Sequence, residues 1–443
     1  MKIETLFFTA KHTLLNAASV ILVSALMVST SAVAQVEINI DGGVEQGTPI
    51  AIVPFKVADG VELEHQIHSI VANDLYSTGK FEPIPSEKFL TLPSKIEEVR
   101  AKDWRLINAQ ILVFGEIWSL GKDLFEVQFR MYDIARDRQV GKTKRIPNLR
   151  AKDLRAVAHV ISDDVYTAFT GRGGAFRSSI AYVDREQKGP QRYRYKLMVA
   201  DWDGFNAAEV YASKNPILSP DWSPDSQKLA FVNLTKKGPV VKVLDLASGR
   251  TEDIAKFKGV NTAPAWSPDG AQLAYSSSRH GSPDLFIYNT QTKEHTRVTT
   301  HYGIDTEPAW GPRGETLMFT SNRSRKPQIF RYSLLDESIT RMTFEGDENA
   351  NASYDSDGKN IVMVHDGGNI VLMNTESSEM QWLTKAKFDE SPSFSPNGDM
   401  VLYMTEQGFE PTMVVASTDG RVRTRVQFVQ GDVREPAWSP LKR

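Results

Sequence analysis

Cysteine is absent from the 443 residues of this chain. Its absence excludes disulfide bonds, thiolate metal sites and a cysteine nucleophile. A basic surplus is absent too, since 52 Lys and Arg residues stand against 55 Asp and Glu residues and the net charge is −3. Nucleic-acid-binding proteins usually carry a basic surplus or patch, so we expect no nucleic-acid partner. Beyond residue 34 no run is apolar enough for the ~20-residue span of a membrane helix.

The first residues have the organisation of a secretory signal peptide. Lys2 and Lys11 accompany the uncharged stretch Leu14–Val28, and the A-x-A pattern that precedes signal-peptidase cleavage ends at Ala34. The alternative, an uncleaved membrane anchor, is disfavoured because the apolar core is shorter than the ~20 residues of a span. The sequence therefore predicts a signal peptide over 1–34, cleavage between Ala34 and Gln35, and a mature protein outside the cytoplasm that does not span a membrane.

An anchor of the form P-x-aromatic-S-P-[DN]-G recurs six times in the C-terminal part of the chain. The successive anchor aromatics are 44, 44, 44, 40 and 44 residues apart. Within the anchor, Ser-Pro-Asp-Gly has the residues of a type I turn. Alternating runs rich in β-branched and aromatic residues follow each anchor, and four strands in about 44 residues are typical of one propeller blade. The six anchor aromatics are Trp222, Trp266, Trp310, Tyr354, Phe394 and Trp438.

The two ends of the repeat predict how the ring closes. The last anchor, at Trp438, has almost no chain after it, whereas the strand-like runs Ile180–Val183 and Tyr195–Val199 have no anchor before them. Joining these two parts completes a sixth blade and protects its edge. The sequence therefore predicts an all-β six-bladed propeller with WSPDG-type repeats over 173–443, closed by the C-terminal strand.

Residues 35–172 lack the repeat and predict a small α/β domain. Apolar and polar residues alternate from Val36 to Ile40, and IAIVPF over Ile50–Phe55 is typical of a buried strand. The segment Gly171–Gly174 is a plausible hinge before the propeller. Further elements are expected as helices over Leu63–Leu75 and Leu149–Phe169 and as strands over Ala109–Ile117 and Leu124–Ile134.

Motifs for catalysis are weak or missing. Gly141-Lys142-Thr143 resembles the end of a phosphate loop, but Arg136 stands where that loop needs glycine. His65 and His68 could both face a metal, yet no third ligand accompanies them. Similar blades occur in prolyl oligopeptidase and tricorn peptidases, but no G-x-S-x-G elbow is present. We therefore expect no catalytic residues, no metal, no cofactor and no enzymatic activity.

The loops that enter the innermost strands should share one face with the loops between the second and third strands of each blade. The latter contribute Arg279-His280 and Arg323-Ser324-Arg325. Together they predict a polar, charged ring around a concave mouth. Such a ring could bind a peptide or protein, or hold calcium through oxygen ligands. The entering positions are Asn261, Thr262, Asp305, Thr306, Glu307, Asn349, Asn351, Asp389, Glu390, Arg434 and Glu435.

This combination of segments resembles the TolB family, the periplasmic components of the Tol-Pal system of Gram-negative bacteria. The resemblance covers essentially the whole mature chain and includes the six anchors. Its specific pieces are QVEINIDGG from Gln35, Pro54-Phe55, DLYSTGKF over Asp74–Phe81, GAF over Gly174–Phe176 and the last anchor EPAWSP from Glu435.

The resemblance implies a periplasmic adaptor that binds the lipoprotein Pal through the propeller mouth and TolA through its mature N-terminus. Such an adaptor supports outer-membrane invagination during cell division and outer-membrane integrity. Other outer-membrane-associated proteins are further candidate partners. The implied Pal contacts match Val260, Asn261, Thr262 and Thr306, although many family members have histidine where Val260 stands.

The TolA segment runs from Gln35 to about Gly47. Its alternation suits addition of a strand to a partner's sheet. The alternative function is a sugar- or ion-binding propeller, or a degenerate relative of the hydrolases. The TolA-binding positions are Gln35, Val36, Glu37, Ile38, Asn39, Ile40 and Asp41.

Overall fold

The computed structural model describes residues 46–58, 63–386, 388–407, 410–426 and 432–441. The predicted signal peptide and the predicted TolA-binding positions Gln35–Asp41 lie outside these ranges. No helix in the described part of the chain is long and apolar enough to cross a membrane.

The N-terminal domain is built on a mixed sheet with the strand order β3-β1-β4-β5-β6, in which β2 also pairs with β4. Strand β1 runs parallel to both neighbours, and β4, β5 and β6 are antiparallel. The strands are β1 Thr48–Ile52, β2 Lys56–Val57, β3 Phe81–Pro83, β4 Ile111–Gly121, β5 Leu124–Asp133 and β6 Arg138–Leu149.

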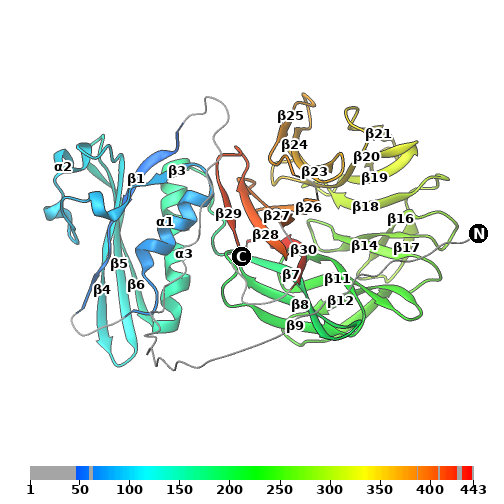
Figure 1. Ribbon diagram of the computed structural model, residues 1–443, viewed down its shortest axis with the longest axis horizontal. Helices are drawn as coiled ribbons and strands as arrows, with labels where there is room; N and C mark the ends of the chain where they lie inside the picture. The colour runs from blue at the N-terminus through cyan, green and yellow to red at the C-terminus, as the bar shows by residue number, and fades with distance from the viewer. Residues whose placement is uncertain (1–45, 59–62, 387, 408–409, 427–431, 442–443) are drawn as a thin grey trace, which may run out of the picture. The chain divides into compact units, whose positions relative to one another are not determined.

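Two helices, α1 (Ile67–Ser77) and α3 (Leu154–Thr170), lie side by side against one face of this sheet (Figure 1). The apolar stripe of α1 is buried because Ile67, Val71 and Leu75 fall at helical spacing. On the other face, α2 (Ala101–Arg105) buries Trp104 in a second core. Short 3₁₀ turns are η1 Ser86–Lys88, η2 Ile96–Glu98 and η3 Ala151–Asp153.

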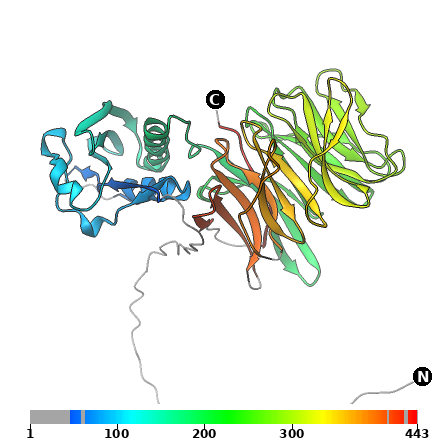
Figure 2. The ribbon, with the colours of Figure 1, turned by 90° about the horizontal axis from the view of Figure 1, so that it is seen from above.

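Six four-stranded antiparallel sheets form the propeller, and they follow one another in chain order (Figures 1 and 2). Blades 1 to 3 are β10 Ile217–Trp222, β11 Lys228–Thr235, β12 Gly238–Asp245, β13 Thr251–Ala255; β14 Asn261–Trp266, β15 Gln272–Ser277, β16 Asp284–Asn289, β17 His295–Arg297; and β18 Asp305–Trp310, β19 Thr316–Ser324, β20 Lys326–Ser333, β21 Ile339–Arg341.

Blades 4 and 5 are β22 Asn349–Tyr354, β23 Asn360–His365, β24 Asn369–Asn374, β25 Met380–Trp382; and β26 Glu390–Phe394, β27 Met400–Gln407, β28 Glu410–Ser417, β29 Arg423–Arg425. Blade 6 joins the two ends of the repeat in the order β30-β7-β8-β9. Its strands are β30 Asp432–Trp438, β7 Ser179–Gly189, β8 Arg192–Asp201 and β9 Ala208–Ser213. The predicted six-bladed propeller and its closure by the C-terminal strand are thus confirmed.

The anchor aromatics tie each blade to the one before it. The indole N–H of Trp310 donates to the carbonyl of Ala265 at 3.0 Å, and that of Trp222 donates to Ala437 at 3.2 Å. At the closure, the Trp438 indole N–H donates to Ser178 Oγ at 2.7 Å, and its ring stacks on Trp202 with centroids 6.1 Å apart. The anchors therefore hold the ring together, as their apolar character predicts.

Trp438→Ala should lower the free energy of unfolding by about 3–5 kcal/mol, because it removes a buried aromatic from the strand that closes the ring. Trp382→Ala is the matched control, since this indole lies on the outer strand β25 and is 43% exposed. We expect the control to cost less than about 1 kcal/mol. Denaturant unfolding followed by tryptophan fluorescence and circular dichroism measures both values; equal losses would contradict the closure role.

The predicted hinge Gly171–Gly174 is held on both sides rather than free. Gly171 ends α3 in the left-handed conformation, with φ 73°. Arg172 then donates to Asp399 Oδ1 at 3.1 Å and to the Asn397 carbonyl at 2.6 Å. A Cβ on Gly174 would lie 2.1 Å from an Asp163 carboxylate oxygen. The junction between the domains is therefore closely bonded.

Candidate protein-binding site at the propeller mouth

The six innermost strands, β10, β14, β18, β22, β26 and β30, all begin on the same face of the ring, which we call the mouth. Antiparallel order then brings the loops between the second and third strands to the same face. The turns between the third and fourth strands lie on the opposite face. This arrangement agrees with the predicted grouping of loops.

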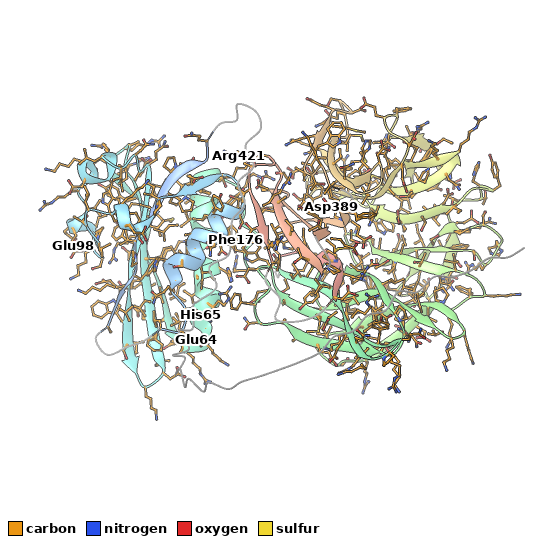
Figure 3. All side chains as sticks on the ribbon, viewed as in Figure 1. Glu64, His65, Glu98, Phe176, Asp389 and Arg421 are labelled. Carbon is orange, nitrogen blue, oxygen red and sulfur yellow. The ribbon has the colours of Figure 1, made fainter. Side chains whose placement is uncertain are left out.

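In four blades a polar residue at the start of the innermost strand, or directly before it, is buried in the blade. Asn261, Asp305 and Asn349 are 0% exposed, and Asp389, labelled in Figure 3, is 2% exposed. Asn261 Nδ2 donates to the Phe257 carbonyl at 2.7 Å, which secures the loop that enters β14. These four predicted site residues therefore support the mouth loops from within.

Each of these side chains has partners inside its own blade. Asp305 accepts hydrogen bonds from Ser321 Oγ at 2.6 Å and from the Arg323 guanidinium at 2.7 Å. Asn349 donates to the Glu345 carbonyl at 2.8 Å. Because burying an unpaired polar group costs about 1–3 kcal/mol, these contacts matter to the fold as well as to the mouth.

The next residue along the chain reaches the surface in three of these blades, as does Arg434 in blade 6. Thr262, Thr306 and Arg434 are partly exposed, and Glu390 is exposed. Arg434 Nε donates to Asp432 Oδ1 at 2.7 Å. Although the side chain reaches the surface, partial loss of hydration raises the pKa of the Glu390 carboxyl; Arg434 acts in the opposite direction, and the charge of Glu406 adds to the rise.

Each innermost strand also contains a bulge, where the ladder to the second strand is interrupted. In all six bulges one residue has a positive φ, between 49° and 55°, although none of these residues is glycine. This conformation is uncommon for residues with a side chain, and its recurrence marks a repeated bulge at the mouth. The six residues are Ser219, Ala263, Glu307, Asn351, Ser391 and Glu435.

Two of these bulge residues link neighbouring blades through carboxylates. Glu307 Oε2 accepts the Asn351 backbone N–H at 2.8 Å and the Thr320 hydroxyl at 2.7 Å. Glu435 Oε2 accepts the Ser219 backbone N–H at 3.2 Å. Burial raises the pKa of Glu435 to about 7, and the nearby charges of Glu390 and Glu307 add to the rise. These predicted site residues thus hold the ring together where it surrounds the channel.

Glu307→Ala should cost about 1–3 kcal/mol of folding stability, because the Asn351 N–H at the inner strand loses its carboxylate acceptor. Glu307→Gln keeps an acceptor oxygen at the same place and should retain most of that stability. Thr306→Ala, at the neighbouring surface position, should leave stability within about 0.5 kcal/mol. Urea unfolding measures the stability of the three variants and of the unaltered chain. A Glu307→Ala variant as stable as the unaltered chain would contradict the bridging role.

Exposed apolar side chains surround the same mouth, and the sequence reasoning singled out only Val260 among them. Val260 is 40% exposed, Tyr302 85%, Ile304 46%, Phe344 68% and Phe388 64%. They lie in the segments that enter four consecutive innermost strands, β14, β18, β22 and β26. A recognisable signal was present in the sequence: large apolar residues recur in the polar loops just before four of the six anchor strands.

The predicted basic residues of the companion loops divide into two groups. Arg279 lies over the rings of Phe257 and Phe286, at 4.2 and 3.9 Å, and Arg323 is paired with Asp305. These cations are fixed by neighbours within the propeller. His280 and Arg325 are exposed beside them, so the mouth combines apolar side chains with a charged rim, as protein interfaces do.

The alternative motifs find no support in their surroundings. Gly141-Lys142-Thr143 lies within the edge strand β6 and is not followed by a helix that could receive a phosphate. His65 contacts the ring of Phe205, with centroids 5.8 Å apart. Among the described residues, the one group of three potential metal ligands is Asp74, His159 and Asp203, and it includes neither His65 nor His68.

The chain is a two-domain propeller protein with a partly apolar mouth. Its α/β domain precedes a six-bladed propeller, and the C-terminal strand closes the ring. Family models described as the TolB amino-terminal domain and the TolB beta propeller domain match residues 36–140 and 166–442. The chain belongs to the TolB family of Tol-Pal system proteins.

Individual relatives agree with this assignment. The chain is 50% identical over 419 residues to the Tol-Pal system protein TolB of Nitrosococcus oceani, covering 94% of this chain and 96% of that protein. It is 46% identical over 429 residues to that of Xanthomonas euvesicatoria, covering 95% and 97%. The crystal structure of TolB from Acinetobacter baumannii matches with a TM-score of 0.81 and 37% identity, covering 92% of this chain and 100% of that one.

Proposed function

We propose that this chain is a periplasmic, non-enzymatic adaptor of the Tol-Pal system that binds the lipoprotein Pal at its propeller mouth and TolA through its mature N-terminus. In this role it supports outer-membrane invagination during cell division and outer-membrane integrity. Membership of the TolB family supports a place in the Tol-Pal system. The choice of the mouth for Pal rests on the side chains that this face presents.

The exposed apolar residues of the mouth are the observation that carries the proposal. Tyr302, Phe344 and Phe388 each leave more than half of their side chain in water, which is unfavourable unless another surface covers them. Aromatic residues near the centre of an interface commonly supply much of the binding free energy. A folded protein domain of complementary shape is therefore the partner that suits this face.

The predicted Pal-binding residues then have two roles. Val260, Thr262, Thr306, Glu390 and Arg434 lie at the surface and can contact Pal directly. The buried and partly buried positions in the same segments support the loops that present the apolar residues. The residues in this supporting role are Asn261, Asp305, Asn349, Asp389, Asn351, Glu307 and Glu435.

For TolA, the proposal concerns the chain before β1. Val36, Ile38 and Ile40 alternate with Glu37, Asn39 and Asp41, and such a segment can add a strand to the edge of a partner's sheet. Cleavage between Ala34 and Gln35 would make Gln35 the first residue of the mature protein. N-terminal sequencing of the exported protein tests the cleavage site; a mature start elsewhere would redefine this segment.

Affinity capture with the tagged mature chain in a periplasmic extract tests the proposal as a whole. We expect recovery of Pal and of the soluble domain of TolA, each identified by mass spectrometry. A chain carrying alanine at Tyr302, Phe344 and Phe388 is the matched control, and it should lose Pal but keep TolA. Recovery of neither partner by the unaltered chain would contradict the adaptor function.

A further inference from the structure

Four ionisable side chains meet where the N-terminal domain contacts blade 6. Asp74 comes from α1, Arg155 and His159 come from α3, and Asp203 comes from the turn between β8 and β9. Asp74 is 1% exposed, His159 3% and Arg155 8%. Two opposite pairs of charges are thus enclosed between segments far apart in the sequence.

The imidazole of His159 lies between the carboxylates of the two domains. Its Nδ1 is 2.8 Å from Asp74 Oδ2, and its Nε2 is 3.6 Å from Asp203 Oδ2. The Ser162 hydroxyl donates to the same Asp74 oxygen at 2.6 Å. Arg155 donates through its guanidinium to Asp203 Oδ2. The imidazole therefore joins α1 to the propeller through α3.

With both carboxylates ionised, the charges balance only when the imidazole is protonated. Two carboxylates and one guanidinium would otherwise leave a buried negative charge, which is strongly unfavourable. Burial raises the pKa of Asp203, while His159 and Arg155 act to lower it. With both nitrogens protonated, one N–H faces each carboxylate. Burial acts to lower the pKa of His159, but the charge and hydrogen bond of Asp74, together with Asp203, raise it to about 9 against the opposing effect of Arg155.

A metal ion is not the best explanation of this cluster. Asp74, His159 and Asp203 offer ligand atoms within 4.8 Å of one another. However, the Arg155 guanidinium already neutralises Asp203, and Asp74 already accepts bonds from Ser162 and His159. A divalent cation would stand beside Arg155 and leave surplus positive charge, so the four side chains complete one another without it.

Aromatic rings pack beside the cluster and cover part of it. The Arg155 guanidinium lies 3.5 Å from the ring centroid of Phe205, which also contacts the ring of His65. In the same turn, Trp202 is 3% exposed and packs against Phe176. His65 and Phe176 are labelled in Figure 3. The burial of Asp74 and His159 strengthens the charge interaction between them.

A second set of contacts joins the same domain to blade 5. The Tyr166 hydroxyl donates to Asp399 Oδ2, and Arg172 pairs with Asp399 Oδ1 at 3.1 Å. The Arg421 guanidinium, labelled in Figure 3, donates to the Gly79 carbonyl. Breaking the cluster at blade 6 would therefore leave the domains joined at blade 5.

We propose that Asp74, Arg155, His159 and Asp203 form a proton-dependent clamp that fixes α1 and α3 to blade 6. Opening the clamp lets the N-terminal domain turn on its blade 5 contacts while both domains stay folded. The charged groups that face His159 are Asp74 from α1, Arg155 from α3 and Asp203 from blade 6. His65, on the segment before α1, faces Phe205 instead.

The sign of the pH dependence follows from the raised pKa. A base whose pKa is higher in the folded protein than in the unfolded chain stabilises the folded state. This stabilisation is complete at pH values below the pKa in the unfolded chain, about 6.5 for histidine, and it is lost as the pH rises through the pKa in the folded protein. The clamp should therefore be closed at neutral pH and open as the pH passes about 9.

Distance measurements between two spin labels test this proposal in the full mature chain. Because cysteine is absent, the double variant Lys102→Cys and Lys237→Cys carries one label in the N-terminal domain and one in blade 1. Both positions are exposed. We expect a narrow distance distribution at neutral pH that broadens about twofold or more above pH ~9. In the His159→Gln and Asp203→Asn variants the distance distribution should be broad already at neutral pH and should not broaden further above pH ~9.

His295→Gln is the matched control, because His295 contacts Tyr275 within blade 2 and not the other domain. This variant should show the same narrow distance distribution at neutral pH as the unaltered chain, and the same broadening above pH ~9. Circular dichroism at each pH confirms that both domains stay folded during the measurement. A distribution that is unchanged through pH ~9 in the unaltered chain, or identical in His159→Gln, would overturn the clamp.

Discussion

Replacing Tyr302 and Phe344 together by alanine should weaken the binding of soluble Pal by about 30-fold or more. The two side chains are 85% and 68% exposed, and they lie in neighbouring segments that enter β18 and β22. Each aromatic ring that Pal covers should contribute about 1–2 kcal/mol or more. Calorimetric titration of the mature chain with Pal measures the loss of affinity.

The same blade provides a control for this prediction. Leu335 is 79% exposed, but it lies in the turn between β20 and β21, on the face opposite the mouth. Leu335→Ala should leave the affinity for Pal within about twofold of the unaltered chain. Equal losses in Leu335→Ala and in the double variant would show that exposed apolar area, rather than the mouth, explains the effect.

Deleting residues 35–45 should abolish measurable binding of TolA while leaving the affinity for Pal unchanged. A segment that adds a strand to a partner supplies main-chain hydrogen bonds and alternating side chains, and its removal takes away both. The deletion stops before the chain becomes part of the sheet. Thr48 N–H donates to the Lys80 carbonyl at 2.8 Å, and a Cβ on Gly47 would lie 2.9 Å from the Phe81 carbonyl carbon.

Point variants separate strand addition from a simple need for this length of chain. Ile38→Asp with Ile40→Asp should weaken TolA binding about tenfold or more, because one face of the added strand becomes charged. Glu37→Gln with Asn39→Ser alters the alternate positions and should change the affinity by less than about threefold. Biolayer interferometry with immobilised TolA compares them. Undiminished binding by the deletion variant would contradict the assignment.

The propeller could be predicted from sequence because its information is local and repeated. Each Ser-Pro-Asp-Gly turn carries its own backbone preferences, and the regular spacing of the anchors sets the number of blades. The closure followed from a missing anchor near Ile180 and a surplus one at Trp438. By contrast, β6 was not predicted, because Arg138–Leu149 is a polar edge strand with little alternation and contains Pro147.

The grouping of these loops on one face was predicted, but the direction of their side chains was not. A bulge with positive φ at Glu307 and its equivalents shifts the alternation along the inner strand. Before that bulge, Asp305 is buried in the blade, whereas Tyr302 and Ile304 are exposed. The cluster around His159 was also missed, since its members come from three distant segments and share no spacing that a sequence pattern could reveal.

Hydrogen–deuterium exchange of the mature chain with and without Pal tests the central claim most directly. The account predicts slower exchange in the described mouth segments 256–260, 298–304, 342–348 and 383–386 when Pal is bound, because their amides become covered. The turns on the opposite face, such as that containing Leu335, should exchange at the same rate with and without Pal. Protection confined to that opposite face or to the N-terminal domain would contradict the mouth as the docking site.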